Sequence, residues 1–218
     1  MLPNDLAPVE VRVIGSLIEK ELSTPDHYPL SLNALTSACN QSSNRDPVMS
    51  LEEGAVAQAI DTLRRQGLVR SIQAIGSRVP KYQHLLAESG DLSRAELAVL
   101  CVLALRGRQT QAEVRARAAR LMPGDDSTGL DTALEALMAR EPRPVVARLA
   151  RRPGQKEPRY AHLLAGDVAE AIDDAPLQPQ TTSTATERMA SLEEQVQELR
   201  NEISDLRAQL GAFRKQFE

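Results

Sequence analysis

Two short stretches of the chain are nearly identical, and they constrain its organisation more than any other feature. Residues 80–86 read Pro-Lys-Tyr-Gln-His-Leu-Leu, and residues 158–164 read Pro-Arg-Tyr-Ala-His-Leu-Leu. A repeat present in two copies indicates a duplicated domain, because a solenoid needs more units than that. We therefore expect two similar units, each ending in this stretch, followed by a tail.

The pattern of the first unit, residues 1–90, predicts three helices and a β-hairpin. Pro8 suits the first helical turn, and Ser31 suits the N-cap of the second helix. Ser50 and Glu53 form the capping-box pattern of a third helix, and Gly67 suits the position just after that helix. The hairpin is expected to comprise a strand, a tip and a return strand, at residues 68–73, 74–78 and 79–84.

The second unit, residues 91–172, repeats that order. Ser93 and Glu96 form another capping-box pattern, and Thr110 suits the N-cap of the next helix. The third helix is expected to start at Ser127 or Thr128, and the hairpin to occupy 145–149, 152–156 and 158–162. The fold class is thus mainly α with small β-hairpins (α+β), and the order of elements is typical of tandem winged-helix domains, with the helix-turn-helix in the second and third helices.

The chain changes character after the second unit. Residues 173–186 hold two prolines and a Thr/Ser run, which is typical of a flexible linker. Apolar residues then recur at spacings of three and four over residues 187–218, which predicts a C-terminal coiled-coil helix. We expect a homodimer through this helix, although a tail helix that folds back on its own domain fits the same pattern. The residues expected at the dimer seam are Leu192, Val196, Leu199, Ile203, Leu206, Leu210 and Phe213.

The sequence offers no catalytic arrangement. A glycine-rich phosphate loop, a Cys-x-x-Cys pair, a His-Glu-x-x-His motif and a nucleophile elbow are all absent, so we predict no enzyme activity, no cofactor and no metal site. Cys39 and Cys101 lie in apolar helical patterns and are expected to be buried free thiols. His84 and His162 each follow a Tyr by two residues, which favours structural packing, with Tyr82 and Tyr160 as core anchors.

Composition indicates where the protein resides but only weakly what it binds. The chain has no apolar run of about 18 residues and no signal-peptide pattern, so we expect a cytoplasmic protein with no membrane partner. The net charge is −4. That charge is unevenly spread, since residues 91–172 are net basic and their positive charge is nearly all Arg. Arg is the better donor fork for phosphate, but a mixed Arg/Glu surface is also ordinary solvated helix.

Double-stranded DNA is the partner that the predicted fold favours. Winged helices usually contact DNA with the third helix in the major groove and with basic residues of the hairpin tip on the backbone. The carboxylates at the start of both third helices fit a groove poorly, although they suit helix N-termini. The basic candidates lie at the tips, at the end of the first third helix and on the second helix of unit two: Arg64, Arg65, Arg78, Lys81, Arg115, Arg117, Arg120, Arg151, Arg152, Lys156 and Arg159.

A polar loop before the first third helix is the remaining candidate. It offers Asn40, Gln41, Asn44 and Arg45, and Asn, Gln and Arg are the side chains that read base edges. The same residue types also stabilise irregular loops through local backbone hydrogen bonds. Asn44 and Arg45 are the residues we expect to reach base edges.

Several runs resemble the YceH family of bacterial proteins. The most specific lies within residues 28–49, Tyr-Pro-Leu-Ser-Leu-Asn-Ala-Leu-Thr, Ala-Cys-Asn-Gln and Ser-Asn-Arg-Asp-Pro-Val-Met, and others are residues 19–21, 105–107 and 153–157. The resemblance implies a tandem winged-helix fold and brings neither catalytic residues nor an established ligand. The chain departs from the family at His27, where members commonly have Tyr, and at Ser42, where many have Lys.

Two hypotheses follow from the sequence. The first is a DNA-binding, regulatory protein that dimerises through its C-terminal coil. The second is a protein–protein interaction adaptor that uses the winged-helix surfaces to bind a protein partner, which the acidic third helices suit. A continuous positive stripe across both tips would favour DNA, and acidic or apolar patches facing the same way would favour a protein partner.

Overall fold

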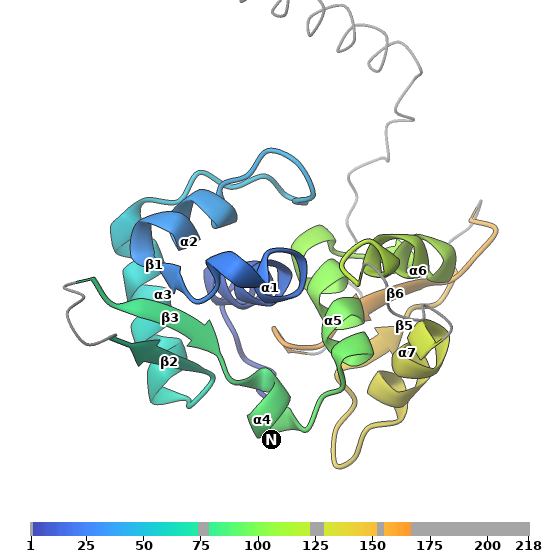
Figure 1. Ribbon diagram of the computed structural model, residues 1–218. Helices are drawn as coiled ribbons and strands as arrows, with labels where there is room; N and C mark the ends of the chain where they lie inside the picture. Colours follow the sequence, from blue (N-terminus) through green and yellow to red (C-terminus); the bar gives the residue numbers. More distant parts are fainter. Residues whose placement is uncertain (1, 74–78, 123–128, 152–154, 167–218) are drawn as a thin grey trace, which may run out of the picture. The chain divides into compact units, whose positions relative to one another are not determined.

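A computed structural model describes residues 2–73, 79–122, 129–151 and 155–166 (Figure 1). These residues form an α+β fold of seven α-helices and two three-stranded antiparallel sheets. The linker and coil expected over residues 173–218 lie outside the described residues, as do Arg78 at the first hairpin tip and Arg152 at the second.

The first half contains four helices, one 3₁₀ turn and three strands. They run in the order α1 Pro8–Ser23, η1 Pro25–His27, β1 Leu30–Ser31, α2 Leu32–Cys39, α3 Glu53–Arg65, β2 Val69–Ile72, β3 Lys81–His84 and α4 Leu86–Gly90. The second half repeats this order from α5, as α5 Arg94–Arg106, β4 Gln109–Thr110, α6 Gln111–Ala119, α7 Gly129–Ala139, β5 Val146–Arg148 and β6 Arg159–His162.

The register of the two sheets shows the duplication directly. The strand orders are β1-β3-β2 and β4-β6-β5, so the repeated stretch forms the central strand of each sheet. Ser31 pairs with Lys81, and at the equivalent place Thr110 pairs with Arg159. Likewise β2 places Val69 opposite His84, and β5 places Val146 opposite His162.

Most helix ends agree with the caps expected from the sequence. The Ser31 hydroxyl accepts from Ala34 N, and Ser93 and Thr110 form capping boxes with Glu96 and Glu113. Gly67 follows the C-cap of α3 with φ +71°, a conformation that glycine adopts without strain.

The start of α3 was predicted wrongly. The helix begins at Glu53 with Glu52 as N-cap, so Ser50 caps nothing. The Asn40 side chain explains the difference, because its Nδ2 donates to Leu51 O (2.8 Å) and its Oδ1 accepts from Leu51 N (2.7 Å). This pair of bonds holds the chain out of the helix as far as Leu51.

Besides the 3₁₀ turn η1, three elements were missed from the sequence. β1 and β4 are two residues long, and α4 is five. Periodicity is not visible over so few residues, and both short strands exist only because the central strand of the sheet offers them an edge.

One apolar core runs through both halves. α1 packs against α5, and the buried side chains of the two halves form a single cluster. Gly15 allows the close approach, since a Cβ there would lie 2.8 Å from Leu105 Cδ2. Cys101 Sγ, in α5, donates to Gly15 O (3.4 Å). The boundary expected at residues 90–91 falls between α4 and α5, yet the core continues across it.

The repeated stretch contributes to this core as expected, but unequally. Tyr160 is buried, whereas Tyr82 is half-buried against the core. The predicted buried thiols are confirmed, because Cys39 and Cys101 are both free and buried. Within the described part of the chain, no helix is long and apolar enough to cross a membrane.

Candidate nucleic-acid interface

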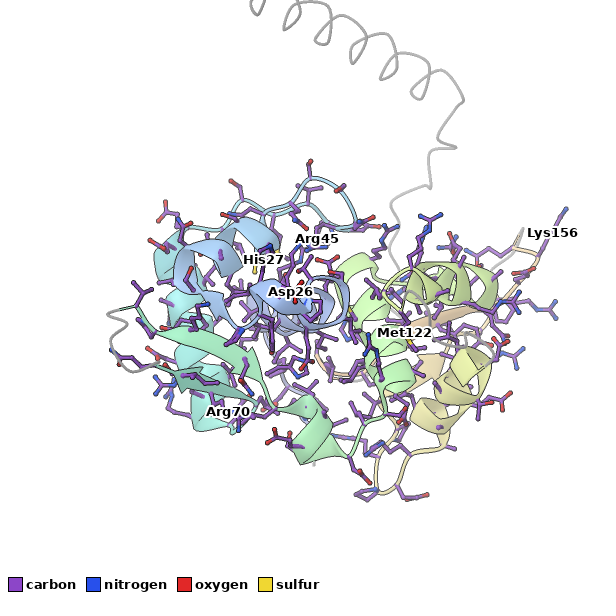
Figure 2. The ribbon with its side chains drawn as sticks, viewed as in Figure 1. Asp26, His27, Arg45, Arg70, Met122 and Lys156 are labelled. Atoms are coloured by element: carbon purple, nitrogen blue, oxygen red, sulfur yellow. The ribbon has the colours of Figure 1, made fainter. Side chains whose placement is uncertain are left out.

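Arg45 is buried rather than free to reach a base edge. Its residue exposure is 6%. The guanidinium donates to both carboxylate oxygens of Glu19 on α1, at 3.0 and 2.6 Å. Its remaining hydrogen bonds go to the backbone carbonyls of Ala38 and Asn44 and to the side-chain Oε1 of Gln41. The expectation that Arg45 reads bases is therefore corrected, because every guanidinium nitrogen already donates a hydrogen bond inside the protein. Figure 2 shows Arg45 between α1 and the loop that carries it.

Residues 40–52, here called the 40–52 loop, are held at further points. Arg12 on α1 is buried and donates to Cys39 O (3.0 Å) and to Pro47 O. Burial and then the charge of Arg45 lower the pKa of Arg12. On the other side of the loop, Asp46 N donates to Leu105 O at the end of α5 (2.8 Å). The loop is thus fixed to both halves of the molecule.

Asn44 is the polar residue of the loop that stays exposed among those expected to bind. It has φ +61°, in the left-handed region where Asn is enriched among non-glycine residues. Asn40 is bonded to Leu51, and Gln41 accepts from Arg45 (3.0 Å). Of the four loop candidates, only Asn44 is exposed to solvent, as a base contact requires.

A series of neighbouring cations runs from the end of α5 past α6 to the second hairpin, and it is called the α6 basic surface below. It combines residues from the end of α5, from α6 and its end, and from the second hairpin. Its members are Arg106, Arg117, Arg120, Lys156 and Arg159. Arg120 and Lys156 are exposed and the others are half-buried, and Figure 2 shows Lys156 pointing away from the protein.

Charge repulsion and one carboxylate organise this surface. Burial lowers the pKa of Arg106, and the neighbouring charges of Arg117 and Arg120 lower it further, while the Glu19 carboxylate opposes them in part. Arg117 lies 3.3 Å from Glu113 Oε1, and Arg159 donates to Arg108 O (3.1 Å). Burial alone would raise the pKa of Glu113, but hydrogen bonds from Thr110 and the charges of Arg117 and Arg159 hold it below its usual value. Glu113 therefore stays ionised and offsets only part of the positive charge.

A hollow opens beside this surface, at the tip end of the second hairpin. Its volume is about 230 Å³, and it is lined by Thr110, Gln155, Lys156, Glu157 and Arg159. Two cations and one carboxylate therefore meet at the N-terminus of α6.

The other predicted DNA-binding residues that the structure describes lie elsewhere on α3 and α6 or near the hairpins. Arg115 is exposed and paired with Asp131 (3.4 Å), and Arg64 is exposed and paired with Asp61 (3.3 Å). Arg65 is exposed and donates to Asp61 O and Thr62 Oγ1 on its own helix. Lys81 and Arg151 are exposed near their hairpins.

The exposed face of α3 is acidic at its start. Glu52, Glu53, Gln58 and Asp61 are all exposed there, as the sequence suggested. On α7, Glu135 is exposed, and Asp131 is half-buried and accepts from Gln111 (2.9 Å).

Sequence reasoning missed the groups that anchor the loop and extend the surface. Glu19 and Arg12 lie among buried apolar residues of α1, and a charge inside the run Val-Arg-Val-Ile was the available signal for Arg12. Arg106 was overlooked because it ends a helix, where a cation is ordinary. Among the described residues, no group of three or more His, Cys, Asp or Glu side chains is placed to hold a metal ion.

Both repeated histidines pack against the protein, His84 buried and His162 half-buried. His84 is buried beside the Glu21 carboxylate, and its backbone N donates to Tyr28 Oη (2.8 Å). Burial raises the pKa of Tyr28. His162 has no such carboxylate among its described contacts, and burial lowers its pKa to about 4.

Comparison with known proteins places the chain in a family. The family model described as "Protein of unknown function, DUF480" matches residues 6–155. The chain belongs to this family. The resemblance to YceH proteins is thereby confirmed.

Relatives of this family match along nearly the whole chain. A UPF0502 protein of Pelobacter propionicus is 51% identical over 213 residues, which covers 96% of each chain. A UPF0502 protein of Geobacter sulfurreducens is 50% identical over 218 residues, or 98% of each chain. A UPF0502 protein of Vibrio atlanticus is 46% identical over 200 residues, covering 89% of this chain and 92% of its own.

Proposed function

We propose that this family member is a tandem winged-helix protein that binds double-stranded DNA in the cytoplasm, in a regulatory role. The observation that carries the proposal is the α6 basic surface, where five cations are offset by Glu113 and, at the hollow, by Glu157. Arg and Lys gathered on one face are the electrostatic footprint of nucleic-acid binding.

The crowding of these cations supports a polyanionic ligand. Arg106 is half-buried, and the charges of Arg117 and Arg120 repel it while the Glu19 carboxylate attracts it. A phosphate placed among the three would relieve that repulsion. Arg106, Arg117 and Arg120 lie on or next to α6, and Lys156 and Arg159 lie on the second hairpin. The second half would therefore bind the DNA backbone with its α6 side.

The third helices suit this role less well. The exposed carboxylates of α3 would face phosphates if that helix entered a major groove, and like charges in contact reduce affinity. We therefore place phosphate binding on α6 and the second hairpin, and not on α3 or α7.

Binding to random duplexes at increasing salt tests the proposal. The full-length protein is titrated with a fluorescent duplex of about 30 base pairs, and log K should fall linearly with log salt, by about 0.9 for each phosphate contact. Arg120→Gln and Lys156→Gln should each reduce this slope by about one contact. Arg64→Gln, which removes a cation from α3, is the matched control and should leave the slope unchanged. Absence of binding at the lowest salt would overturn the proposal.

A protein partner is the second candidate. Val48 on the 40–52 loop and Val79 before β3 are large apolar side chains exposed by 58% and 56%. Together with the carboxylates of α3 they offer the first half as a protein-binding face. Capture of a protein from cell extract that Val48→Ser abolishes, without any effect of Lys156→Gln, would favour this adaptor role.

Dimerisation through the C-terminal helix belongs to the same proposal. It rests on the heptad spacing of Leu192, Val196 and their neighbours, which lie outside the described residues. Light scattering on the full chain and on a chain ending at Asp173 tests it. Equal numbers of chains per particle in both samples would remove the argument for a coil.

A further inference from the structure

We propose that Asn44 contacts base edges beside the α6 basic surface, and that buried Arg45 and Glu19 are positioning residues that hold it there. The inference rests on the proposed DNA binding and deepens it. It names the residue that supplies sequence preference and separates it from the cations that supply affinity.

The fold brings the 40–52 loop to the edge of the basic surface. Asp46 N bonds to Leu105 O (2.8 Å), and Arg106 is the next residue of that chain segment. Asn44 precedes Asp46 by two residues. A duplex whose phosphates lie on Arg106 and Arg120 would therefore pass the loop, although the loop belongs to the other half of the molecule.

Among the Asn, Gln and Arg side chains of the loop, Asn44 is left as the contacting one. Asn40 is occupied by the backbone of Leu51, and Gln41 by Arg45. Arg45 itself is enclosed by Glu19 and two carbonyls. Asn44 is exposed, and an Asn side chain can form two hydrogen bonds with adenine N6 and N7 in the major groove.

The anchoring of the loop explains why a single amide could discriminate bases. Base readout needs a side chain held in fixed register, and loop residues are ordinarily too mobile for that. Here Arg45 ties the loop to α1 and α2, Arg12 holds Pro47 O, and Asp46 N holds the end of α5. The carbonyl of Asn44 itself accepts from Arg45 (3.0 Å), so the anchor acts on the backbone of the contacting residue.

Selection from a random duplex pool tests this inference with full-length protein. The wild type should enrich a motif, which is then compared with a scrambled duplex in direct titrations. Asn44→Gly keeps the left-handed backbone and removes the amide, and Asn44→Asp keeps the shape and removes the donor. Each should lower the preference for the enriched over the scrambled duplex by about tenfold. The salt slope should stay unchanged for Asn44→Gly, whereas Asn44→Asp adds a negative charge that also weakens binding to both duplexes. Asn33→Asp, the same exchange at an exposed site on α2, is the control and should change neither quantity.

Arg45→Lys tests the positioning role. It keeps the charge but loses the two-pronged bond to Glu19, so it should lower the preference to the level of Asn44→Gly without altering the salt slope. A merely structural role would lower all binding in proportion to the folded fraction, which circular dichroism measures, and would leave the preference intact.

The outcomes separate this inference from the proposed function. If the wild type binds duplexes but Asn44→Gly selects the same motif with the same preference, Asn44 is not the base contact, while DNA binding stands. If the wild type enriches no motif, the inference also fails and DNA binding stands. If the wild type binds no duplex even at the lowest salt, both fail together.

Discussion

Arg12 and Arg45 lie inside the first half, although arginine is rarely buried without a partner. Their partners are the Glu19 carboxylate and carbonyls of the 40–52 loop and the end of α2. Such a pair stabilises less than its geometry suggests, because both charges lose their hydration. Removing only one partner of the pair is nevertheless costly, since the charge of the other partner then stays buried without compensation. At the scale of single residues, this cluster is where substitutions should have the largest effect.

Arg45→Met should destabilise the protein by about 3 kcal/mol, because it leaves Glu19 buried without its main partner. Lys20, at 3.9 Å from Glu19, keeps the loss from being larger. Urea unfolding followed by circular dichroism measures the change. Arg64→Met, which breaks the exposed pair with Asp61, is the control and should cost less than about 1 kcal/mol. Equal losses in the two variants would show that the buried pair has no special role.

His162 should make the protein less stable as the pH falls from about 6.5 to about 4. Burial lowers its pKa from the ordinary 6.5 to about 4, so the folded state keeps it neutral while the unfolded state takes up a proton in that window. The contribution of neutral His162 to the free energy of unfolding is fully present above pH 6.5 and is lost as the pH falls toward 4. The free energy of unfolding of His162→Gln, measured from pH 7 to pH 4.5, should vary less steeply than that of the wild type. Parallel profiles would contradict the assignment.

Helices α1 and α5 set the geometry at the scale of elements. A glycine inside a helix costs about 1 kcal/mol relative to alanine, so Gly15 needs a reason to be in the middle of α1. The reason is the side chain of Leu105, which occupies the space that a Cβ would need. The same contact brings the end of α5, and with it Arg106, close to the loop carried by the first half.

Gly15→Val should therefore destabilise the protein, by about 1–3 kcal/mol through overpacking alone. Thermal unfolding measures the loss. Gly54→Ala is the matched control, because Gly54 is also helical and a Cβ there meets nothing within 4 Å. That control should be neutral or slightly stabilising through its better helix propensity. A neutral Gly15→Val would mean that α1 and α5 do not pack as closely as described.

At the scale of the whole molecule, residues 1–166 behave as one body despite the duplication. The core is shared, and backbone bonds cross between halves, from Leu6 N to Leu164 O (3.0 Å) and from Asp46 N to Leu105 O. In addition Arg140 donates to Gly90 O. The halves should therefore not fold independently.

A fragment of residues 1–90 should consequently lack a cooperative unfolding transition, because it exposes the face of α1 around Gly15 that α5 covers. The full chain should show a single transition over the same residues, with coincident midpoints by fluorescence-labelled and circular dichroism probes. A fragment that unfolds cooperatively at the midpoint of the full chain would contradict this prediction.

The order of helices and hairpins could be predicted because its signals are local. Ser31, Ser93 and Thr110 cap helices through their own side chains, and Gly67 adopts a conformation that most residues avoid. The duplicated Tyr and His positions were visible as a repeat, and the structure places them on the central strands. These features depend on a few neighbouring residues, so the sequence alone determined them.

Only the tertiary structure decided which charged side chains are buried, paired or exposed. Arg45 and Asn44 are adjacent and both polar, yet one is enclosed by Glu19 from a distant helix and the other faces solvent. Arg106 and Arg120 end different helices, and only the packing of α5 against α6 brings their charges together. Whether a cation is buried, paired or exposed depends on groups far away in the chain. Local pattern therefore gave the elements, and long-range packing chose which of their charges remain available to a partner.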